Sequence, residues 1–309
     1  MHKKRVITGI GLAVLATLIW SGNYVIARGV YKQINPVSLA FYRWGTATVI
    51  LFPFAVRRFS SEWRIIRRSW KYLFWVALSG IGLFNTIVYY AGHFTTAINL
   101  ALIGTTTSPV ISIILARIFL KERIGFMKIA GLILCIVGIL FLLSKGNLRN
   151  LFTLSFSIGD AWMLVAAFCF SVYVVLVRKK PADMSPSSFL LAIFSLGTLL
   201  LLPFFLWQYS VAPVLNWNLG LLGSILYIGL GASVISYFLW NTAISILGAG
   251  RTALFGNLIT VFSSLEAVML LNEQFSWVHV ISMLLVFAGL LLANLRPRKF
   301  VTNKVKQVA

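Results

Sequence analysis

The sequence is poor in charged side chains and poorest in acidic ones. Only 11% of its 309 residues are charged, whereas 60% are hydrophobic, and the mean hydropathy is +0.92. Because soluble globular domains carry roughly a quarter charged residues, this composition excludes an ordinary soluble domain. The apolar runs are about 20 residues long and do not alternate with polar residues, which predicts membrane-spanning helices and not a transmembrane barrel.

Cysteine and histidine are also scarce, with two of the first and three of the second. Cys135 and Cys169 each lie inside an apolar run, as small buried residues do, and His2, His93 and His279 are scattered at or near the ends of runs. The sequence lacks a phosphate-binding glycine loop as well. We therefore expect no metal, no cofactor and no ATP hydrolysis, and a membrane-embedded enzyme is disfavoured.

The six acidic residues stand against 27 lysines and arginines, which gives a net charge of +21. Such an excess can indicate a nucleic-acid partner, but these basic residues occupy short connections between apolar runs instead of one soluble face. We expect the lipid bilayer, and not a nucleic acid, as the partner. The run that begins at Ile7 is too long for the apolar part of a signal peptide, so we expect it to be retained as the first span.

Ten apolar runs are long enough to cross a bilayer. They are Ile7–Val30, Val37–Val56, Tyr72–His93, Ala97–Leu120, Ile124–Leu143, Ile158–Val177, Ser187–Tyr209, Asn218–Asn241, Thr252–Leu271 and Trp277–Leu295. Lysine and arginine gather at alternate ends: six lie between spans 2 and 3, against two between spans 5 and 6. By the positive-inside rule, both termini are predicted to be cytoplasmic. The expected fold is an all-α, multi-pass protein of the cell membrane with ten transmembrane helices.

The second half of the chain repeats the first in altered form. GTTTSPVISIILARIFLKE at residues 104–122 matches FGNLITVFSSLEAVMLLNE at 255–273 in five of nineteen positions, at a constant offset of 151. LIWSGNYVIAR at 18–28 likewise aligns with FCFSVYVVLVR at 168–178. We predict two five-helix repeats, 1–150 and 151–295, followed by a basic cytoplasmic tail, 296–309. Because five is odd, the repeats have opposite orientations, an arrangement that many secondary transporters use.

Taken in order, several motifs resemble the drug/metabolite transporter superfamily, in particular its ten-span EamA-type exporters. The resemblance rests on IWSGNYVIAR in span 1, FYRW in span 2, SPVISIILARIFLKER at the end of span 4, Gly159-Asp160 and the second ending, LNEQ. It covers about Leu12 to Leu295 and implies a transporter of small metabolites. The family commonly has proline at the position of Pro109 in both repeats, whereas the second copy here has Thr260. Any kink in span 9 must therefore have another source.

Glu266 is the acidic residue that lies well inside a predicted span, about six residues before the end of span 9. An ionisable group costs a few kcal/mol at such a depth, so it indicates either a site or a partner. One hypothesis is a carboxylate that binds a proton or a substrate amine. The alternative is a structural pair with Arg43 in span 2 or with another buried base. Leu115 occupies the matching position in the first repeat, so the duplication does not support either interpretation.

Other charged residues near span ends are predicted to be structural or gating groups. Arg43 could bind a substrate carboxylate, but the resemblance implies an arginine here whatever the substrate, which favours a structural role. Asp160 begins span 6, where a helix N-terminus favours a carboxylate, and it is interpreted as a cap. Glu122 and Glu273 close spans 4 and 9 at the membrane border and are interpreted as turn-stabilising or gating groups.

Aromatic and amide side chains form a second set of candidates. In span 1, Trp20, Asn23 and Tyr24 share one helical face, and further aromatic groups end spans 3 and 8. They line a cavity and gate it, or they form the interfacial aromatic belt of an ordinary membrane protein. The candidate substrate-binding residues are Trp20, Asn23, Tyr24, Tyr89, Tyr90, His93, Thr106, Tyr173, Tyr237, Trp240, Asn241 and Glu266.

Small and hydroxylated residues precede Pro109 in span 4, at Gly104–Ser108. Because proline removes a helical hydrogen bond, we expect a bent or broken span here. The polar, flexible equivalents in the second copy are Thr252, Gly256, Asn257 and Thr260. Spans 5 and 10 combine glycine with aliphatic residues, which suits helix packing or a homodimer contact.

The sequence predicts a secondary transporter that exports small metabolites, such as amino acids or related amphipathic solutes, by alternating access. The alternatives are a channel or facilitator without coupling and, less favoured, a membrane-embedded enzyme.

Overall fold

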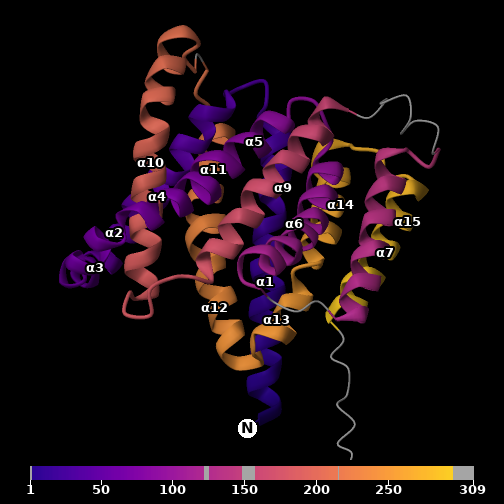
Figure 1. Ribbon diagram of the computed structural model, residues 1–309. Coiled ribbons are helices and arrows are strands. Elements are labelled where there is room, and N and C mark those ends of the chain that lie inside the picture. Colours follow the sequence, from indigo (N-terminus) through magenta and orange to yellow (C-terminus); the bar gives the residue numbers. More distant parts are fainter. Residues whose placement is uncertain (1, 122–124, 148–156, 215, 295–309) are drawn as a thin grey trace, which may run out of the picture.

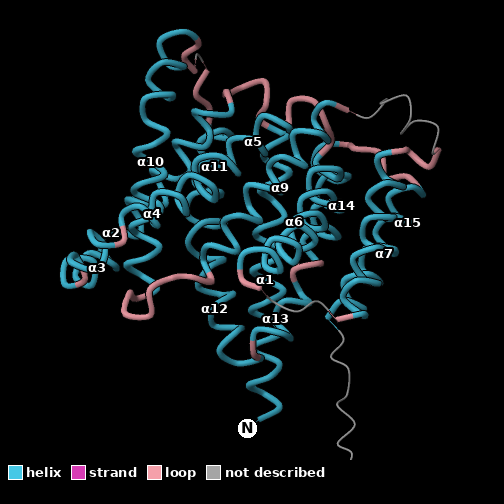
Figure 2. The backbone as a smooth tube through the Cα atoms, viewed as in Figure 1, coloured by secondary structure: helices cyan, strands magenta, loops and turns pink. Residues whose placement is uncertain are grey.

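A computed structural model describes residues 2–121, 125–147, 157–214 and 216–294, and the regular elements within these ranges are all helices (Figures 1 and 2). Eight of the described helices, with helices joined end to end taken as one, are long and apolar enough to cross a membrane. Two shorter apolar helices, Leu258–Leu271 and Trp277–Ala293, complete the set. Large apolar side chains such as Phe54 (76%), Phe126 (80%) and Met269 (78%) are exposed on these helices, as a lipid-facing surface requires.

Most predicted spans are single α-helices. These are α1 (His2–Gly29), α2 (Pro36–Ser61), α6 (Ala97–Phe119), α7 (Phe126–Leu143), α9 (Ile158–Val177), α10 (Pro186–Val211) and α15 (Trp277–Asn294). A short helix, α3 (Trp63–Arg68), lies outside the bundle beyond the end of α2 (Figure 1). The helices α2 and α10 start alike: Asn35 and Ser185 cap the free backbone N–H groups of Ser38 and Ser188, and a proline follows each cap.

The third and eighth spans are interrupted by π-helical segments at matching places. In the third span, η1 (Leu78–Leu83) lies between α4 (Trp70–Ala77) and α5 (Phe84–Ala91). In the eighth, η2 (Tyr227–Ile235) lies between α11 (Leu219–Leu226) and α12 (Ser236–Leu247). Each segment contains Gly-x-Gly, at residues 80–82 and 229–231. The span-length prediction did not foresee these segments, and it ended the eighth span six residues too early.

Side chains satisfy carbonyl groups that the π-helical turns leave without their usual partners. Asn85 Nδ2 donates to the carbonyl of Gly80 at 3.3 Å, five residues earlier. In the second copy, Ser233 Oγ donates to the carbonyl of Ile228 at 2.8 Å, also five residues earlier. Polar side chains thus stabilise backbone distortions inside apolar spans, where water is not available to do so.

Of the bend or break predicted at Pro109, the break does not occur, because α6 continues as one helix through that residue. The break occurs instead in the ninth span, between α13 (Ala249–Phe255) and α14 (Leu258–Leu271). Gly256 and Asn257 form the intervening turn. The packing of α6 against its neighbours outweighs the one hydrogen bond that proline removes, whereas the glycine in the ninth span offers a flexible backbone.

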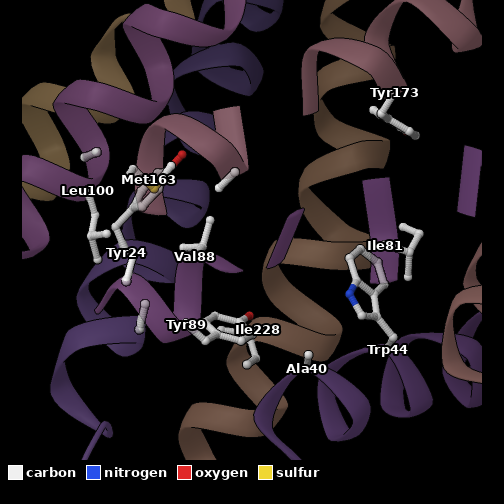
Figure 3. Close-up of a cluster of buried hydrophobic side chains, with 14 of the residues drawn as sticks. Tyr24, Ala40, Trp44, Ile81, Val88, Tyr89, Leu100, Met163, Tyr173 and Ile228 are labelled. Atoms are coloured by element: carbon white, nitrogen blue, oxygen red, sulfur yellow. The ribbon is translucent and has the colours of Figure 1, made fainter. Parts of the chain in front are cut away.

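Helices from one half of the chain pack against helices from the other half. Helix α1 packs against α12 and α14, while α9 packs against α5 and α6. Across the middle, α2 packs against α10 and α6 against α14, and α7 and α15 lie side by side at the edge of the bundle (Figure 1). Figure 3 shows part of the buried interior, where Tyr24 lies beside Met163 and Leu100, and Tyr89 lies beside Ile228.

Candidate functional site

A buried arginine joins four helical segments. Arg43, on α2, is 5% exposed. Its Nη1 donates hydrogen bonds to Asn23 Oδ1 (2.5 Å), Asn85 Oδ1 (2.8 Å) and Tyr89 Oη (2.9 Å). Its Nε donates to Ser233 Oγ at 2.8 Å. We call these five residues the Arg43 network.

The Arg43 network connects the two halves of the chain. Asn23 comes from α1, Asn85 and Tyr89 from α5, and Ser233 from η2 in the second half. All of its members are at most 7% exposed. Within the described part of the chain, the hydrogen-bond partners of Arg43 are neutral groups. They accept from Nε and Nη1, and Nη2 donates no hydrogen bond to a described residue. A buried cation held only by neutral acceptors can take an anionic group without first breaking an ion pair.

Both π-helical segments contribute to this network. Asn85, the second residue of α5 after η1, bonds both to Arg43 and to the carbonyl of Gly80. Ser233, within η2, accepts from Arg43 and donates to the carbonyl of Ile228. The position of the arginine is therefore linked to the backbone distortions of the third and eighth spans, so a change in either segment alters the acceptors of the guanidinium group.

Glu266 lies apart from this network, on α14. Its Oε1 accepts a hydrogen bond from Ser21 Oγ at 2.7 Å. Its Oε2 is buried and has no hydrogen-bond partner among the described residues. Ser21 and Asn23 are two residues apart on α1 and so point to nearly opposite sides of that helix. Glu266 and Arg43 consequently flank α1 instead of forming the structural pair that the sequence left open.

The predicted aromatic residues separate into groups. Trp20 donates from Nε1 to the carbonyl of Ala232 at 2.9 Å, and its ring meets those of Tyr237 and Trp240 at centroid distances of 5.8 and 5.2 Å. These contacts connect α1 with the eighth span. Tyr173, on α9, lies close enough to Tyr237 for their side chains to interact.

Three further candidates lie away from these groups. Tyr24 is 8% exposed and packs beside Met163 (Figure 3). Thr106, on α6, is fully buried, and its hydroxyl has no hydrogen-bond partner among the described residues. Asn241, on α12, is exposed.

Tyr90 and His93 belong to a cluster at the end of the third span. The His93 ring contacts Tyr90 and Tyr31 at centroid distances of 6.4 and 5.5 Å. Arg28 lies over the Tyr31 ring and donates to the carbonyls of Gly92 and His93. Partial burial and the nearby Arg28 lower the pKa of His93 below its usual value.

The acidic residues at span ends stabilise other helices. Glu273 accepts hydrogen bonds from the backbone N–H groups of Ala97 (2.7 Å) and Ile98 (3.1 Å), the first residues of α6. Two of the free N–H groups at that helix start are thereby satisfied by a charge that the helix dipole favours. Glu122, the matching residue of the first half, lies outside the described residues.

The sequence suggested that Asp160 caps α9, but the structure does not place it at the cap position. Ser157 is the N-cap, and Asp160 lies in the first turn. The Asp160 carboxylate instead accepts hydrogen bonds from Thr95 Oγ1 (2.5 Å) and Asn99 Nδ2 (3.2 Å) at the start of α6. It therefore ties the beginning of α9 to the beginning of α6.

Removing the Glu273 carboxylate is expected to destabilise the fold without removing any residue of the Arg43 network. We expect Glu273→Ala to cost about 0.5–2 kcal/mol, the usual cost of losing an N-terminal cap. Thermal unfolding of the detergent-solubilised protein measures the effect. Asp183→Ala, at an exposed loop position, is the matched control and is expected to leave the midpoint unchanged. Equal midpoints for the two variants would contradict the capping role.

Three functional candidates were missed by the sequence analysis: Asn85, Ser233 and Ser21. Asn85 carried a usable signal, since it is the only amide in the third span and a buried amide needs partners. Ser233 and Ser21 carried none, because serine is common in membrane helices and often bonds to its own backbone. Glu62 was also missed; its carboxylate accepts from the backbone and hydroxyl groups of Ser185 at the start of α10.

Comparison with known proteins matches two segments of the chain to the same family. The EamA-like transporter family matches residues 7–144 and 157–295. An uncharacterized transporter of Archaeoglobus fulgidus is 27% identical over 93% of this chain and 98% of its own length. A probable amino-acid metabolite efflux pump of Escherichia coli K12 is 24% identical over 94% of this chain and 96% of its own length.

A comparison of structures agrees on the fold alone. One crystal structure aligns with a TM-score of 0.61 at 17% identity and covers 94% of this chain and 97% of that one. The apolar helices and the exposed apolar surface define a multi-pass integral membrane protein of the cell membrane. The chain belongs to the EamA-like transporter family, within the drug/metabolite transporter superfamily. It is a membrane transporter, as the family and the names of its relatives indicate.

Proposed function

We propose that the protein is a secondary transporter that exports small metabolites, amino acids or related amphipathic solutes, by alternating access. The observation that carries this proposal is the Arg43 network, a buried polar cluster that joins the two halves of an otherwise apolar bundle. Buried polar groups in membrane spans are costly and mark substrate or ion pathways. The amino-acid assignment is supported by the name of the Escherichia coli relative.

Two inverted five-helix repeats, 1–150 and 151–295, form the proposed framework, with ten spans, a basic tail at 296–309 and both termini in the cytoplasm. The exchanged packing of α1 and α9 supports this arrangement. So does the contact between Thr48 and Thr198, whose hydroxyl oxygens are 3.4 Å apart where α2 crosses α10. These threonines are 150 residues apart, so they are equivalent positions that meet, as expected near a twofold axis between repeats.

In this proposal, the halves move relative to each other and exchange the acceptors of Arg43. The bond from Arg43 Nε to Ser233 crosses between the halves, as does the bond from Trp20 to the carbonyl of Ala232. A substrate carboxylate near Nη2 would gain charge-assisted hydrogen bonds and weaken the hold of the neutral acceptors. Binding would thereby favour the state in which the halves have separated on one side.

Purified protein in proteoliposomes tests the proposal. We expect counterflow of at least one labelled amino acid from a broad panel, at a rate well above that of protein-free vesicles. Vesicles containing an Arg43→Lys variant provide the control for activity that depends on the network. If no amino acid, amine or nucleoside in the panel enters the proteoliposomes faster than it enters protein-free vesicles, the transporter assignment is refuted for these solutes.

A facilitator without coupling is the alternative, and the response to a pH gradient distinguishes it. Glu266 is the candidate coupling group because its Oε2 is buried without a partner in the described part of the chain. A proton-coupled transporter accumulates solute when a pH gradient is imposed, and Glu266→Gln removes that accumulation while exchange without a gradient continues. A facilitator equilibrates solute equally with and without the gradient.

A further inference from the structure

A pocket of about 400 Å³ lies between α1, the α11–η2 segment and α14. Its volume falls within the roughly 300–1,000 Å³ of small-molecule sites. The lining residues are Gly22, Val25, Ile26, Gly220, Gly223, Ser224, Tyr227, Glu266 and Leu270. The Arg43 network is not among them, because α1 separates it from the pocket.

Glycines and a tyrosine shape this pocket. Tyr227 reaches α1, where its hydroxyl donates to the carbonyl of Ile19 at 2.9 Å. A Cβ atom on Gly22 would lie 2.5 Å from that hydroxyl oxygen, so only glycine lets the tyrosine cross here. At Gly223, by contrast, an added Cβ would have no atom within 4 Å. The pocket is therefore walled by Tyr227 and open at Gly223.

The mouth of the pocket faces an apolar surface. Leu270, which lines the pocket, is 68% exposed, and Leu219 and Leu226, the neighbours in sequence of the lining residues Gly220 and Tyr227, are 87% and 55% exposed. The lining comes from the last turns of α1, the first turns of α11 and the last turns of α14. All three lie at one end of the bundle, which the distribution of basic residues assigns to the outer leaflet.

Glu266 places a carboxyl group inside this largely apolar pocket. The other described acidic residues lie in loops or within the first turn of a helix, as Asp160 does. Ser21 satisfies Oε1, whereas Oε2 is buried without a hydrogen-bond partner in the described part. A carboxylate in this state lacks a donor, and an apolar mouth beside it selects a ligand with an apolar body.

We propose that this pocket binds a single-chain amphiphile with a primary ammonium head. The ammonium group donates to Glu266 Oε2 once the carboxyl group has turned toward the pocket, and the chain lies along Val25, Ile26 and Leu270. Repulsion by the carboxylate excludes a ligand with an anionic head group. A purely apolar ligand would leave Oε2 without a hydrogen-bond donor. The site goes beyond the proposed transport cycle, because occupying it requires no movement of the two halves.

Binding of octylammonium to the protein in phosphatidylcholine nanodiscs tests this site. We expect Glu266→Gln to weaken octylammonium binding at least about tenfold, because the variant keeps the shape and loses the charge. Asp183→Asn, which removes an exposed loop carboxylate, is the matched control and is expected to bind as the unchanged protein does. Octyl sulfate bound as tightly as octylammonium, or equal octylammonium affinities for the two variants, would overturn the proposal.

A second pair of variants tests the place of binding independently of charge. Gly223→Leu fills the open side of the pocket, and Gly11→Leu adds the same side chain to α1 at another position where a Cβ meets no atom within 4 Å. We expect Gly223→Leu to weaken octylammonium binding and Gly11→Leu to leave it unchanged. Equal affinities for these two would place the ligand elsewhere.

Phosphatidylethanolamine carries the same head-group chemistry and distinguishes a lipid from a free amphiphile. We expect octylammonium to bind equally in nanodiscs with and without this lipid. Displacement by phosphatidylethanolamine would assign the pocket to the lipid head group and overturn the free amphiphile. These binding measurements need no transport, so a failure of the metabolite assay and a failure of this site are separate results.

Discussion

Replacing Arg43 by lysine is expected to lower the rate of metabolite counterflow at least about tenfold. The arginine holds Asn23, Asn85 and Tyr89 through Nη1 and Ser233 through Nε. Lysine keeps the charge but presents it from one atom, so it cannot reach the same acceptors together. A hydrogen bond to a charged group contributes roughly 1.5–3 kcal/mol, and 1.4 kcal/mol corresponds to a factor of ten.

The control for this variant is Arg28→Lys. Arg28 donates from Nη1 to the backbone carbonyls of Gly92 and His93, near the end of α1. A lysine ammonium group can serve such carbonyls, so we expect counterflow to remain within a factor of about two. Size-exclusion chromatography of both variants separates lost transport from lost folding. Folded Arg43→Lys protein with an unchanged transport rate would remove the network from the mechanism.

Alanine at the first glycine of either π-helical segment is expected to destabilise the protein and to reduce transport. A Cβ on Gly80 would overlap the ring of Tyr173, and one on Gly229 would lie 2.7 Å from Cβ of Thr46. Neither neighbour can yield easily, because one is a fully packed ring and the other is β-branched. Overpacking of this kind costs about 1–3 kcal/mol. Thermal unfolding and counterflow measure the two effects.

The second glycine of each segment supplies a matched control. At Gly82, the nearest atom to an added Cβ is 3.8 Å away, and at Gly231 it is 3.3 Å away. Gly82→Ala is therefore expected to be neutral or to stabilise by up to about 1 kcal/mol, because alanine favours a helix more than glycine does. Gly231→Ala requires Ile19 Cγ2 to shift slightly and is expected to cost less than Gly229→Ala. If all four alanine variants had the same stability and transport rate, close packing at Gly80 and Gly229 would not explain the loss.

The sequence predicted the spans well where one local rule dominates. Pro36 and Pro186 follow capping residues, and both helices begin there. Local rules failed where neighbouring helices decide. Helix α6 is continuous through Pro109, whereas the ninth span is interrupted by a turn at Gly256 and Asn257. Packing between helices determines at which of these positions the helix ends. The π-helical segments also escaped prediction, since apolar content and length do not distinguish them from an ordinary helix.

In the candidate site, too, the sequence indicates the charged residues and only the structure shows their partners. Arg43 and Glu266 stand out in the sequence because a charge in an apolar span needs a partner, but nothing in their spacing names that partner. The structure brings Asn23, Asn85 and Ser233 to Arg43, from segments up to 190 residues apart. It places Glu266 beside Ser21 on the other side of α1.

Composition and the positions of basic residues determined, without any coordinates, that this is an all-helical membrane protein of many spans. That is so because the cost of placing charge and free backbone groups in lipid acts on each segment separately. The tertiary structure alone decided which polar groups meet. Partner choice depends on how helices from distant parts of the chain pack, and a network of four neutral acceptors around one arginine exists only once those helices are side by side.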